Sequence, residues 1–466
     1  MREEKHGDCR VPDPTYDVVV VGAGMGGMCA GALAVKEGYK TLVVEKREHI
    51  GGRFSTEEVD GFKLMTGAPF IHQSGWVPKV CKEVGVEFDR TPCLEVLYWV
   101  KGVEYKLPLQ HRMNALFEIC NRIASNKAKL MGNIVKEIAG QKIMTSIHSA
   151  VTEPEKLGSI TIKEWLLRYT DNEDVHGIFD AISVGMLMAH SYEIPVYNFF
   201  HFMATQKGFN DVDLSTYGNL ANMEKLAGVV KARGDVWTNC SVKKILVSKG
   251  TAAAVVVEKD GKELEIPCKV AISNIGIRET VQLSGEENFT EDYLADMRVK
   301  MRPAPITIIH IASDQPLCMA GGEAGAMLVA NARRITDAIP LTNACPGMAP
   351  KGQHLTWACA SPPSVLFPID PEEEERQCLK DIDMVFPDWK KKGGRILKME
   401  VRNIDHDLPE GRTWLGPAYN MQRETPVKNL YNVGDAVCSP GIGGTSGCAE
   451  GARRVMESVK KHIKPG

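Results

Sequence analysis

Short apolar runs alternate with glycine-rich turns at both ends of the chain. Residues 18–21 are four consecutive valines, and they lead directly into the sequence Gly-Ala-Gly-Met-Gly-Gly at residues 22–27. A short apolar run bounded by glycine is typical of a strand that is buried on both faces. Small residues then predict a helix from about Met25 to Gly38, and the apolar residues 41–44 predict a second strand. The pattern therefore predicts a strand–turn–helix–strand unit of a parallel α/β sheet.

The first glycine-rich turn has the spacing G-x-G-x-x-G. Gly22 permits the tight bend, Gly24 allows the backbone to approach a pyrophosphate, and Gly27 allows helix and strand to pack closely. The helix that begins there directs unpaired N–H groups and the positive end of its dipole toward phosphates. Glu45 ends the second strand, about 20 residues further on, where a carboxylate accepts hydrogen bonds from a ribose diol. Together these features predict a bound dinucleotide.

Two further segments indicate that the dinucleotide is FAD. After Glu45 the chain continues to a G-G-R triplet at residues 51–53, and glycines and a guanidinium this close to the ribose suit a cofactor that extends past its pyrophosphate. Near the end, a predicted strand at 430–433 runs into a Gly-Asp pair at 434–435, and a glycine-rich stretch at 441–447 opens a helical pattern. One such signature is common among nucleotide-binding proteins, whereas the pair is much rarer.

With these motifs the chain resembles the large flavin-dependent family that contains amine oxidases, protoporphyrinogen oxidases, and carotenoid desaturases and isomerases. The spacing of residues 60–63 (Asp-Gly-Phe-Lys) and 67–69 (Gly-Ala-Pro) most resembles the branch of phytoene desaturases, carotenoid isomerases and retinol saturases. The resemblance also covers a central stretch, residues 217–274. Met65 stands where the family often has an acidic residue, so the surroundings of the flavin ring are expected to differ from those in a typical member.

The resemblance implies an α/β fold, with a Rossmann-like, GR2-type FAD-binding domain and an interleaved α+β substrate domain. Both chain ends and the central stretch are expected to touch one ligand, so each domain is discontinuous. The FAD-binding domain is predicted at residues 16–75, 218–280 and 396–466, and the substrate-binding domain at residues 76–217 and 281–395.

Local patterns predict several elements of the substrate-binding domain. Helical patterns dominate residues 110–205, and residues 302–312 and 353–360 are predicted strands. Asp370 is predicted as the N-cap of a helix that has Pro371 at its first position and acidic residues in its first turn.

The motifs and the resemblance together assign the cofactor contacts. By resemblance, Val242 lies on a strand at 236–247 that passes the adenine, and Asn274 ends the returning strand beside the pyrophosphate. Asp435 is expected to contact the ribityl and phosphate region, and Thr445 stands at the start of a helix whose dipole favours negative charge on the reduced flavin ring. The predicted contacts are Gly22, Gly24, Met25, Gly26, Gly27, Glu45, Lys46, Gly51, Gly52, Arg53, Val242, Asn274, Gly434, Asp435, Gly443, Gly444 and Thr445.

Residues 184–203 are rich in Met and aromatic side chains, which suit an adaptable apolar tunnel for a substrate. The alternative is that they fill a core or a domain interface. The candidate acid–base groups are His72, His190, Tyr192, His201 and His310. His72 is predicted to face the substrate, because it closely follows residues 67–69; the alternative is a hydrogen-bonded structural histidine. No cluster has metal-ligand spacing, so no metal site is predicted.

Charge and composition narrow the class of protein. A net charge of −3 without a basic tract argues against nucleic acid as a partner. The first fifteen residues are polar and carry charges of both signs, unlike a signal or transit peptide, and no run approaches the roughly 18 apolar residues of a membrane span. We therefore expect a cytoplasmic protein with a hydrophobic small-molecule substrate. Peripheral membrane contact is a further implication of the resemblance, and the oligomeric state is left open.

The cysteines fit a reducing compartment. There are 13, with no C-x-x-C spacing, so neither a disulfide framework nor an iron–sulfur site is expected. Cys438 and Cys448 lie close in sequence to the flavin-binding end, where a redox role competes with the alternative that they are small hydrophobic residues.

Three classes of function fit this fold. The motifs favour a flavin-dependent desaturase, saturase or isomerase, in which hydride passes between a carbon of a hydrophobic substrate and flavin N5. The second class is a flavin amine oxidase, but the lysine that this branch usually carries near N5 is missing from residues 306–311, and Cys448 replaces an aromatic residue. The third class is a non-catalytic, prenyl-protein-binding escort protein. A chain without a cofactor has no physical need for all of the motifs described above.

Overall fold

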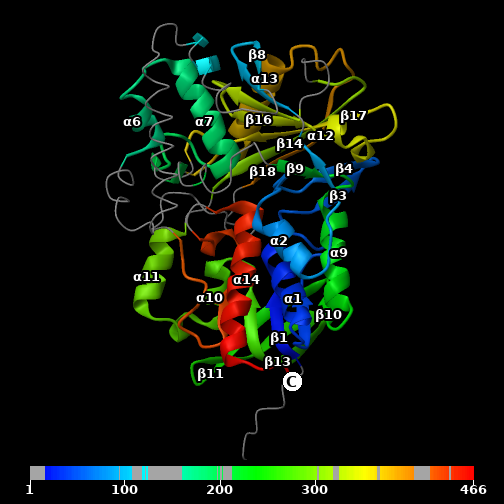
Figure 1. The fold of residues 1–466 in the computed structure, drawn as a ribbon, viewed down its shortest axis with the longest axis vertical. Helices are drawn as coiled ribbons and strands as arrows, with labels where there is room; N and C mark the ends of the chain where they lie inside the picture. The colour runs from blue at the N-terminus through cyan, green and yellow to red at the C-terminus, as the bar shows by residue number, and fades with distance from the viewer. Residues whose placement is uncertain are drawn as a thin grey trace, which may run out of the picture.

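The computed structural model describes residues 16–93, 95–107, 118–120, 122–123, 160–196, 198–199, 202, 212–301, 304–317, 325–364, 368–402, 420–439 and 442–466. Within this part of the chain, helices surround two large sheets, each of seven strands (Figure 1). In that view the first sheet and the two chain ends that build it form the lower half, and the second sheet forms the upper half. The predicted mixed α/β fold class is confirmed.

The first sheet contains the predicted strand–turn–helix–strand unit. Its strands are β1 (Tyr16–Val21), β2 (Thr41–Val44), β10 (Asp235–Trp237), β11 (Cys240–Ser248), β12 (Thr251–Lys259), β13 (Lys262–Ser273) and β19 (Leu430–Asn432). β1 is central and pairs in parallel with β2 and β13, while β13 also pairs in parallel with β19. Every residue of β1 is buried, so its sequence lacks the alternation of a strand with one wet face.

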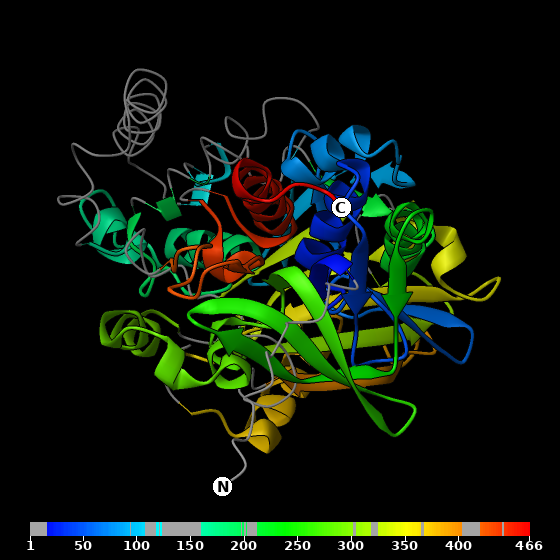
Figure 2. The ribbon, with the colours of Figure 1, turned by 90° about the horizontal axis from the view of Figure 1, so that it is seen from below.

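Three helices lie side by side against this sheet. They are α1 (Met25–Lys36), α9 (Asn219–Lys231) and α14 (Gly444–His462), and Figures 1 and 2 show α1 between the other two. Small residues let α1 approach the sheet closely, since a Cβ at Gly31 would lie only 2.7 Å from Val43 Cγ2. The predicted helix from Met25 is therefore confirmed, with its end at Lys36.

One predicted strand is wrong. The resemblance predicts a single strand over residues 236–247, whereas β10 ends at Trp237 and β11 begins at Cys240. Asn239 between them has a φ of 49°, in the left-handed region, which interrupts an extended strand. β10 therefore pairs with β2, while β11, which carries Val242, pairs with β12.

The second sheet lies in the other half of the molecule. Its order is β18 (Arg395–Arg402), β14 (Ile306–Ser313), β17 (His354–Ala360), β16 (Ile335–Pro340), β15 (Ala326–Ala330), β7 (Val96–Val100) and β8 (Val103–Leu107). The predicted strands at 302–312 and 353–360 correspond to β14 and β17. One face of this sheet packs against α13 (Pro371–Val385) through buried side chains such as Cys378 and Ile382.

The start of α13 is as predicted. Oδ1 of Asp370 accepts hydrogen bonds from the backbone N–H groups of Glu372 at 3.1 Å and Glu373 at 3.4 Å, and Pro371 is the first helical residue. Its acidic first turn matches the positive end of the helix dipole.

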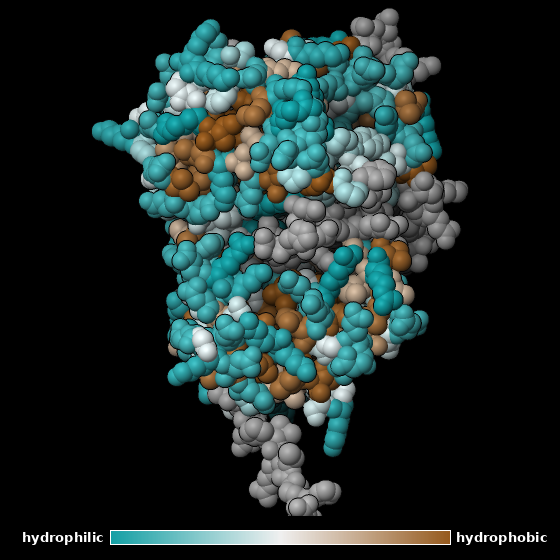
Figure 3. Space-filling model, turned by 180° about the vertical axis from the view of Figure 1, so that it is seen from behind, coloured by the Kyte–Doolittle hydropathy of each residue, from teal (hydrophilic) through white to brown (hydrophobic). Residues whose placement is uncertain are grey.

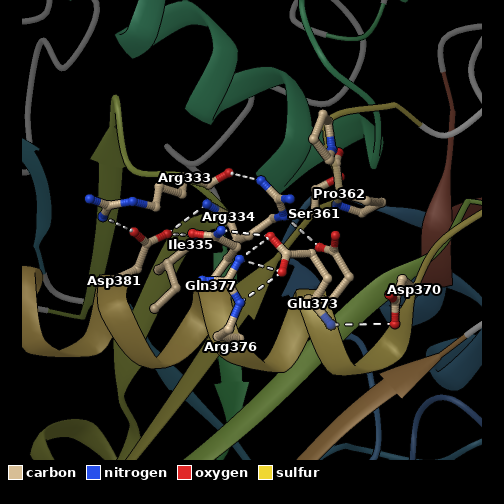
Figure 4. Close-up of polar contacts among 12 residues, drawn as sticks. Arg333, Arg334, Ile335, Ser361, Pro362, Asp370, Glu373, Arg376, Gln377 and Asp381 are labelled. Atoms are coloured by element: carbon tan, nitrogen blue, oxygen red, sulfur yellow. Dashed lines mark hydrogen bonds and ion pairs between the residues drawn. The ribbon is translucent and has the colours of Figure 1, made fainter.

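A polar cluster fastens α13 to the beginning of β16 (Figure 4). Asp381, which is fully buried, accepts the backbone N–H groups of Arg334 at 2.6 Å and Ile335 at 3.0 Å. Its other oxygen accepts Nη1 of Arg333 at 3.1 Å, and Arg334 Nε donates to Glu374 at 2.6 Å. The helix thus fixes where β16 enters the sheet.

Shorter elements connect the two halves or cover their edges. They are the strands β3 (Thr56–Val59), β4 (Phe62–Met65), β5 (Phe70–His72), β6 (Arg90–Pro92) and β9 (Val212–Ser215), the helices α2 (Trp76–Glu83), α6 (Ile162–Leu166), α7 (Glu173–Leu187), α10 (Ile277–Ser284), α11 (Glu291–Lys300) and α12 (Leu341–Ala344), and the 3₁₀ turns η2 (Glu286–Asn288), η3 (Pro346–Met348) and η5 (Asp435–Val437).

Strand pairing and core packing move three of the predicted domain boundaries. β18 begins at Arg395 and pairs with β14, so the segment that starts at residue 396 begins in the second sheet. The helix α2 packs with α1 and α14, and α11 packs into the core of the first sheet through Leu294 and Met297. Both helices lie in segments predicted for the substrate-binding domain, yet their buried side chains complete the core of the first sheet.

Hydrophilic side chains predominate on the face that Figure 3 shows, and apolar residues form small groups between them. Within the described part of the chain, no helix combines the length and the apolar character that crossing a bilayer requires. The cysteines of this part are free thiols, and Cys29 is completely buried inside α1, as expected for a small packing residue.

Loss of the Asp381 carboxylate is expected to destabilise the protein by about 2–4 kcal/mol, because Asp381→Ala leaves two buried N–H groups without an acceptor. Urea unfolding followed by circular dichroism measures this. The matched control is Glu375→Ala on the same helix, where the side chain is exposed and a loss below about 1 kcal/mol is expected. Equal losses in the two variants would contradict the role of Asp381.

Candidate functional site

A cavity of about 600 Å³ is lined by residues of both sheets. Its wall includes residues from the carboxyl ends of β1 and β2, from the N-terminal ends of α1 and α14, and from the second sheet. Ligands of open α/β sheets bind at the carboxyl ends of the strands, and this volume lies in the range of about 300–1,000 Å³ that is usual for small-molecule and cofactor sites.

The structure brings most of the predicted residues to this wall. Those that line the cavity are Gly22, Gly24, Met25, Glu45, Lys46, Gly51, Gly52, Arg53, His72, Val242, Asn274, Gly434, Asp435, Gly443, Gly444 and Thr445. Gly26 and Gly27 are not part of the wall. A Cβ at Gly27 would lie 2.0 Å from the carbonyl oxygen of Gly22, and a Cβ at Gly26 would lie 3.0 Å from Asn274 Nδ2. Both glycines therefore serve close packing behind the wall.

Asn274 connects three segments at the phosphate end of the cavity. Its Oδ1 accepts the backbone N–H of Gly27 at 3.0 Å, and its Nδ2 donates to the carbonyl oxygen of Val433 at 3.1 Å. A Cβ at Gly24 would lie 2.6 Å from the same Oδ1. The amide thus holds the start of α1 against the end of β19, and it does so only because glycine stands at position 24.

Glu45 is fixed at the end of β2. Its side chain is largely buried, with Oε2 accepting the backbone N–H of Ala23 at 2.8 Å and Oε1 accepting the backbone N–H of Arg47 at 3.0 Å. Each carboxylate oxygen has a further lone pair, so both remain able to accept a hydroxyl group from the cavity.

The G-G-R triplet and the C-terminal Gly-Asp pair meet in an ion pair. Nη2 of Arg53 lies 2.9 Å from Oδ1 of Asp435, and both residues line the cavity. Burial on its own would lower the pKa of Arg53, but the charge and hydrogen bond of Asp435 outweigh it, so the pKa is raised and the guanidinium stays charged. The pair closes the site between two segments that lie far apart in sequence.

The start of α14 faces the same cavity. The N-cap residue of α14 is Gly443, which has no side chain that could accept a hydrogen bond. It therefore leaves the N–H groups of the first turn uncapped. Ser446 Oγ accepts the backbone N–H of Trp76 at 3.0 Å, which ties α14 to α2. Gly441 lies outside the described residues, and Cys448 is part of the wall.

His72 lies on β5, half-buried, at the cavity wall. Its ring meets that of Phe202 edge to face, with centroids 6.1 Å apart. The structure therefore places the histidine at the cavity wall, beside an aromatic residue of the Met- and aromatic-rich stretch. Its role toward a substrate stays a prediction.

The other acid–base candidates serve structural contacts. His190 lies between Asp180, at 2.8 Å, and the carbonyl oxygen of Pro362, at 2.7 Å. Tyr192 donates its hydroxyl to the carbonyl oxygen of Pro363. Nε2 of His310 lies 3.1 Å from the carbonyl oxygen of Met65 in a buried position. None of the three is part of the cavity wall, and His201 lies outside the described residues.

The Met- and aromatic-rich stretch serves both of the purposes that its sequence allows. Gly185, Met186, Met188 and Phe202 line the cavity. Val184, Leu187, Ala189 and Phe199 are buried in packing, most of them in a core under α7. Tyr197, Phe200 and Met203 lie outside the described residues.

Sequence reasoning missed the part of the wall that the second sheet supplies. Ile306, Ile308, Asp337, Trp357, Cys359 and Arg402 line the cavity there. Asp337 is the one residue of this group with a signal in the sequence, since it is a lone acid within the otherwise apolar or small residues of β16. In the described residues no group of three or more His, Cys, Asp or Glu side chains is arranged to hold a metal ion.

Residues 20–84 match the model of an NAD(P)-binding Rossmann-like domain. That segment contains the G-x-G-x-x-G turn, Glu45 and the G-G-R triplet, so the predicted Rossmann-like unit is confirmed.

Similar proteins cover the chain to different extents. An uncharacterized protein of Methanocaldococcus jannaschii is 22% identical over 454 residues, which are 94% of this chain and 98% of that protein. An inactive all-trans-retinol 13,14-reductase of Danio rerio is 23% identical over 321 residues, 60% of this chain and 50% of that protein. A 4,4'-diapophytoene desaturase of a Methylomonas species is 39% identical over 61 residues, 13% of this chain and 12% of that protein. The predicted resemblance to desaturases and retinol-modifying enzymes is confirmed.

Solved structures share the whole fold. An oxidoreductase from Methanosarcina mazei is 25% identical, with a TM-score of 0.78, and the match covers 95% of this chain and 100% of that one. A putrescine oxidase is 16% identical, with a TM-score of 0.72 over 96% of this chain and 99% of that one. These matches confirm the predicted fold. A probable flavin-containing monoamine oxidase A of Dictyostelium discoideum is 25% identical over 199 residues, 41% of this chain and 41% of that protein, and agrees with a flavin as the predicted cofactor.

His310 is expected to make the protein less stable in acid. Mainly through burial, its pKa in the folded protein is lowered to about 3, against about 6.5 in an unfolded chain. Between these values the unfolded state binds a proton that the folded state does not bind, so the free energy of unfolding falls by about 1.4 kcal/mol for each unit of decreasing pH.

Unfolding measured between pH 7 and pH 4 tests this expectation. His310→Gln keeps a donor for the carbonyl oxygen of Met65 but has no titrating side chain. Its free energy of unfolding should therefore fall less steeply with decreasing pH than that of the unaltered protein, and the difference in slope should correspond to one proton. The control is Thr307→Val on the same strand, a buried change that removes no titratable group and should leave the slope unchanged. Identical slopes for His310→Gln and the unaltered protein would contradict the expectation.

Proposed function

We propose that this chain is an FAD-dependent oxidoreductase that acts on C–H or C=C bonds of a hydrophobic substrate. The observation that carries the proposal is one continuous cavity. Its wall joins the glycine-rich segments of both chain ends to apolar side chains of the second sheet. A cofactor held at the first part and a substrate held at the second would meet inside the same cavity.

The residues at the first part fit a flavin dinucleotide. The helices α1 and α14 both begin at the wall, and neither N-cap residue, Gly24 or Gly443, makes a side-chain hydrogen bond. The N–H groups and the positive dipole ends of two helices are therefore directed toward bound negative charge. We assign the pyrophosphate to α1 and the pyrimidine side of the flavin ring to α14.

The charged groups of the wall complete this fit. Glu45 has further lone pairs for the ribose hydroxyls, and the Arg53–Asp435 ion pair lines the same wall as the two helix starts. Gly52 and Gly444 have positive φ values of 54° and 53°, and no side chain at either position narrows the wall.

The flavin, when bound, supplies a hydride acceptor or donor at N5. The chain contributes position. Phe70, Met186, Ile306 and Ile308 form an apolar part of the wall that would hold a hydrophobic substrate beside the ring. The imidazole of His72 lies on the same wall, next to the ring of Phe202. We assign to His72 the role of holding or transferring a proton on the substrate.

The residues of β14 favour a reaction at carbon–carbon bonds over amine oxidation. The strand has no lysine, and the lysine opposite its His310, Lys398 on β18, is not part of the cavity wall. Lys398 Nζ instead pairs with Glu57 at 2.6 Å and with Glu400 at 3.3 Å.

Loss of the charge at Glu45 is expected to weaken FAD binding about tenfold or more. In Glu45→Gln the side-chain NH₂ group must face the backbone N–H of either Ala23 or Arg47. One of the two hydrogen bonds is therefore lost, and the side chain is no longer held in place. Asp435→Ala should also weaken FAD binding, because it leaves the partly buried guanidinium of Arg53 without its ion-pair partner at the cavity wall. Flavin absorbance per protein and the Kd from titration with FAD measure both effects. Full flavin occupancy in both variants would refute the assignments, and Glu37→Gln, a surface acid on the far end of α1, is the control.

The substrate class is tested by mixing the purified, flavin-loaded protein without oxygen with two sets of compounds, one of polyenes and terpenoids and one of amines. Polyenes and terpenoids should change the redox state of the flavin, seen at its long-wavelength absorbance band, and primary and secondary amines should not. Reduction of the flavin by amines alone would replace this proposal with amine oxidation.

A further inference from the structure

The part of the cavity wall formed by the second sheet contains a buried carboxyl group, that of Asp337. Only 4% of the residue is exposed. Oδ1 accepts the hydroxyl of Thr336 at 3.0 Å, and the thiol of Cys359, opposite on β17, also bonds the carboxyl group. Among the described residues no cation pairs with Asp337, whereas Asp435 at the other part of the wall has Arg53.

This environment favours the neutral form of the carboxyl group. A carboxylate that is buried without a cation loses its hydration and gains no opposite charge, so it takes up a proton instead. Burial raises the pKa of Asp337 to about 7. A protonated carboxyl group can donate a hydrogen bond through its O–H, which a carboxylate cannot do.

A second donor lies next to Asp337 on the same face of the sheet. Asp337 is directly opposite Cys359, and Trp357 is two residues from Cys359 along β17. Asp337 and Trp357 are therefore diagonal neighbours, about 7–8 Å apart at the backbone, within reach of long side chains. Both line the cavity, and the indole N–H of Trp357 is buried without a hydrogen-bond partner among the described residues.

The third polar side chain of this part of the wall is also a donor. Arg402 is 90% buried, donates to Glu400 at 2.8 Å and to the carbonyl oxygen of Thr66, and its Nε has no partner in the described part of the chain. Indole and guanidinium groups donate hydrogen bonds and accept none. A ligand group that satisfies this set must accept.

We infer that Asp337 and Trp357 bind an oxygen atom of the substrate, so the substrate class is hydrophobic molecules that carry a hydroxyl or carbonyl group. The inference rests on the proposed function, because it places the substrate in this part of the cavity. A pure hydrocarbon would leave both donors without a partner inside an apolar wall, which costs free energy. An ammonium group has donors only and would meet the indole N–H with another N–H.

The position of Asp337 depends on β16 and therefore on α13. The bonds from Asp381 to the N–H groups of Arg334 and Ile335 hold the strand two residues before Asp337 (Figure 4). The carboxyl group is thus presented by a sheet strand and not by a loop.

Binding of a matched set of ten-carbon compounds to the flavin-loaded protein tests the inference. The compounds are geraniol, geranial, geranylamine and the hydrocarbon 2,6-dimethylocta-2,6-diene, and the change in flavin absorbance on titration gives each Kd. Geraniol or geranial should bind at least tenfold more tightly than geranylamine and the hydrocarbon. Trp357→Phe and Asp337→Leu should each weaken binding of the oxygen-bearing compound about tenfold and leave the hydrocarbon unchanged.

Asp337→Asn separates hydrogen bonding from charge, because it retains a donor and cannot ionise. It should keep the affinity for the oxygen-bearing compound within about threefold. The control is Thr307→Val. Thr307 is buried on β14 between the cavity-lining residues Ile306 and Ile308, so it faces the other side of the sheet, and its loss should not alter any Kd.

Three results would overturn the inference: equal binding of all four compounds, tighter binding of geranylamine with loss of that binding in Asp337→Asn, or no spectral response to any compound. In each case the protein still holds flavin, so the proposed cofactor stands. A protein that takes up no FAD contradicts the proposed function itself, and the flavin spectrum recorded before titration distinguishes the two failures.

Discussion

The amide of Asn274 ties the first turn of α1 to the end of β19 at the wall of the cavity. Residues 247 positions apart in sequence meet in its bond to Gly27, and residues 159 positions apart meet in its bond to Val433. One short side chain therefore sets the distance between the first turn of α1 and the end of β19. The glycines around it are a consequence, because any Cβ at Gly24 or Gly26 would occupy the space of the amide. The glycines of the G-x-G-x-x-G turn are thus required for the close packing of Asn274 as well as for the approach of a phosphate.

Charge is distributed unevenly along the cavity. At the first part of the wall, Glu45 accepts two backbone N–H groups, and Arg53 and Asp435 form an ion pair, so each of these side chains has a polar partner. At the second sheet the lone acid, Asp337, has only neutral neighbours. A polar, charged ligand fits the first environment and a largely apolar ligand fits the second. This gradient is what assigns the two parts to two different molecules.

Elements governed by local rules could be predicted from the sequence. The apolar run of β1, the glycine turn before α1 and the Asp370 cap of α13 each depend on a few neighbouring residues, and the structure has all three. The split between β10 and β11 could not be predicted, because it depends on the left-handed conformation of Asn239 and on pairing with two different strands. Asp337 was missed for a related reason. Its place at the cavity follows from the pairing of β16 with β17 and from the anchoring of β16 by α13, both of which join distant segments. The same holds for α2, whose apolar face is visible in the sequence although the helices α1 and α14 that it packs against are not. The sequence of α11 has no clear apolar face, and its Leu294 and Met297 become core residues only through tertiary packing.

The Arg53–Asp435 ion pair spans 382 positions of a 466-residue chain. A nascent chain therefore carries the N-terminal part of its dinucleotide site well before Asp435 and α14 are synthesised. Cofactor loading must wait for these residues, and a nascent chain that ends before α14 exposes the apolar side of α1 against which that helix packs. The synthesis of α14 and the acquisition of the ligand are thus coupled steps in the maturation of this protein.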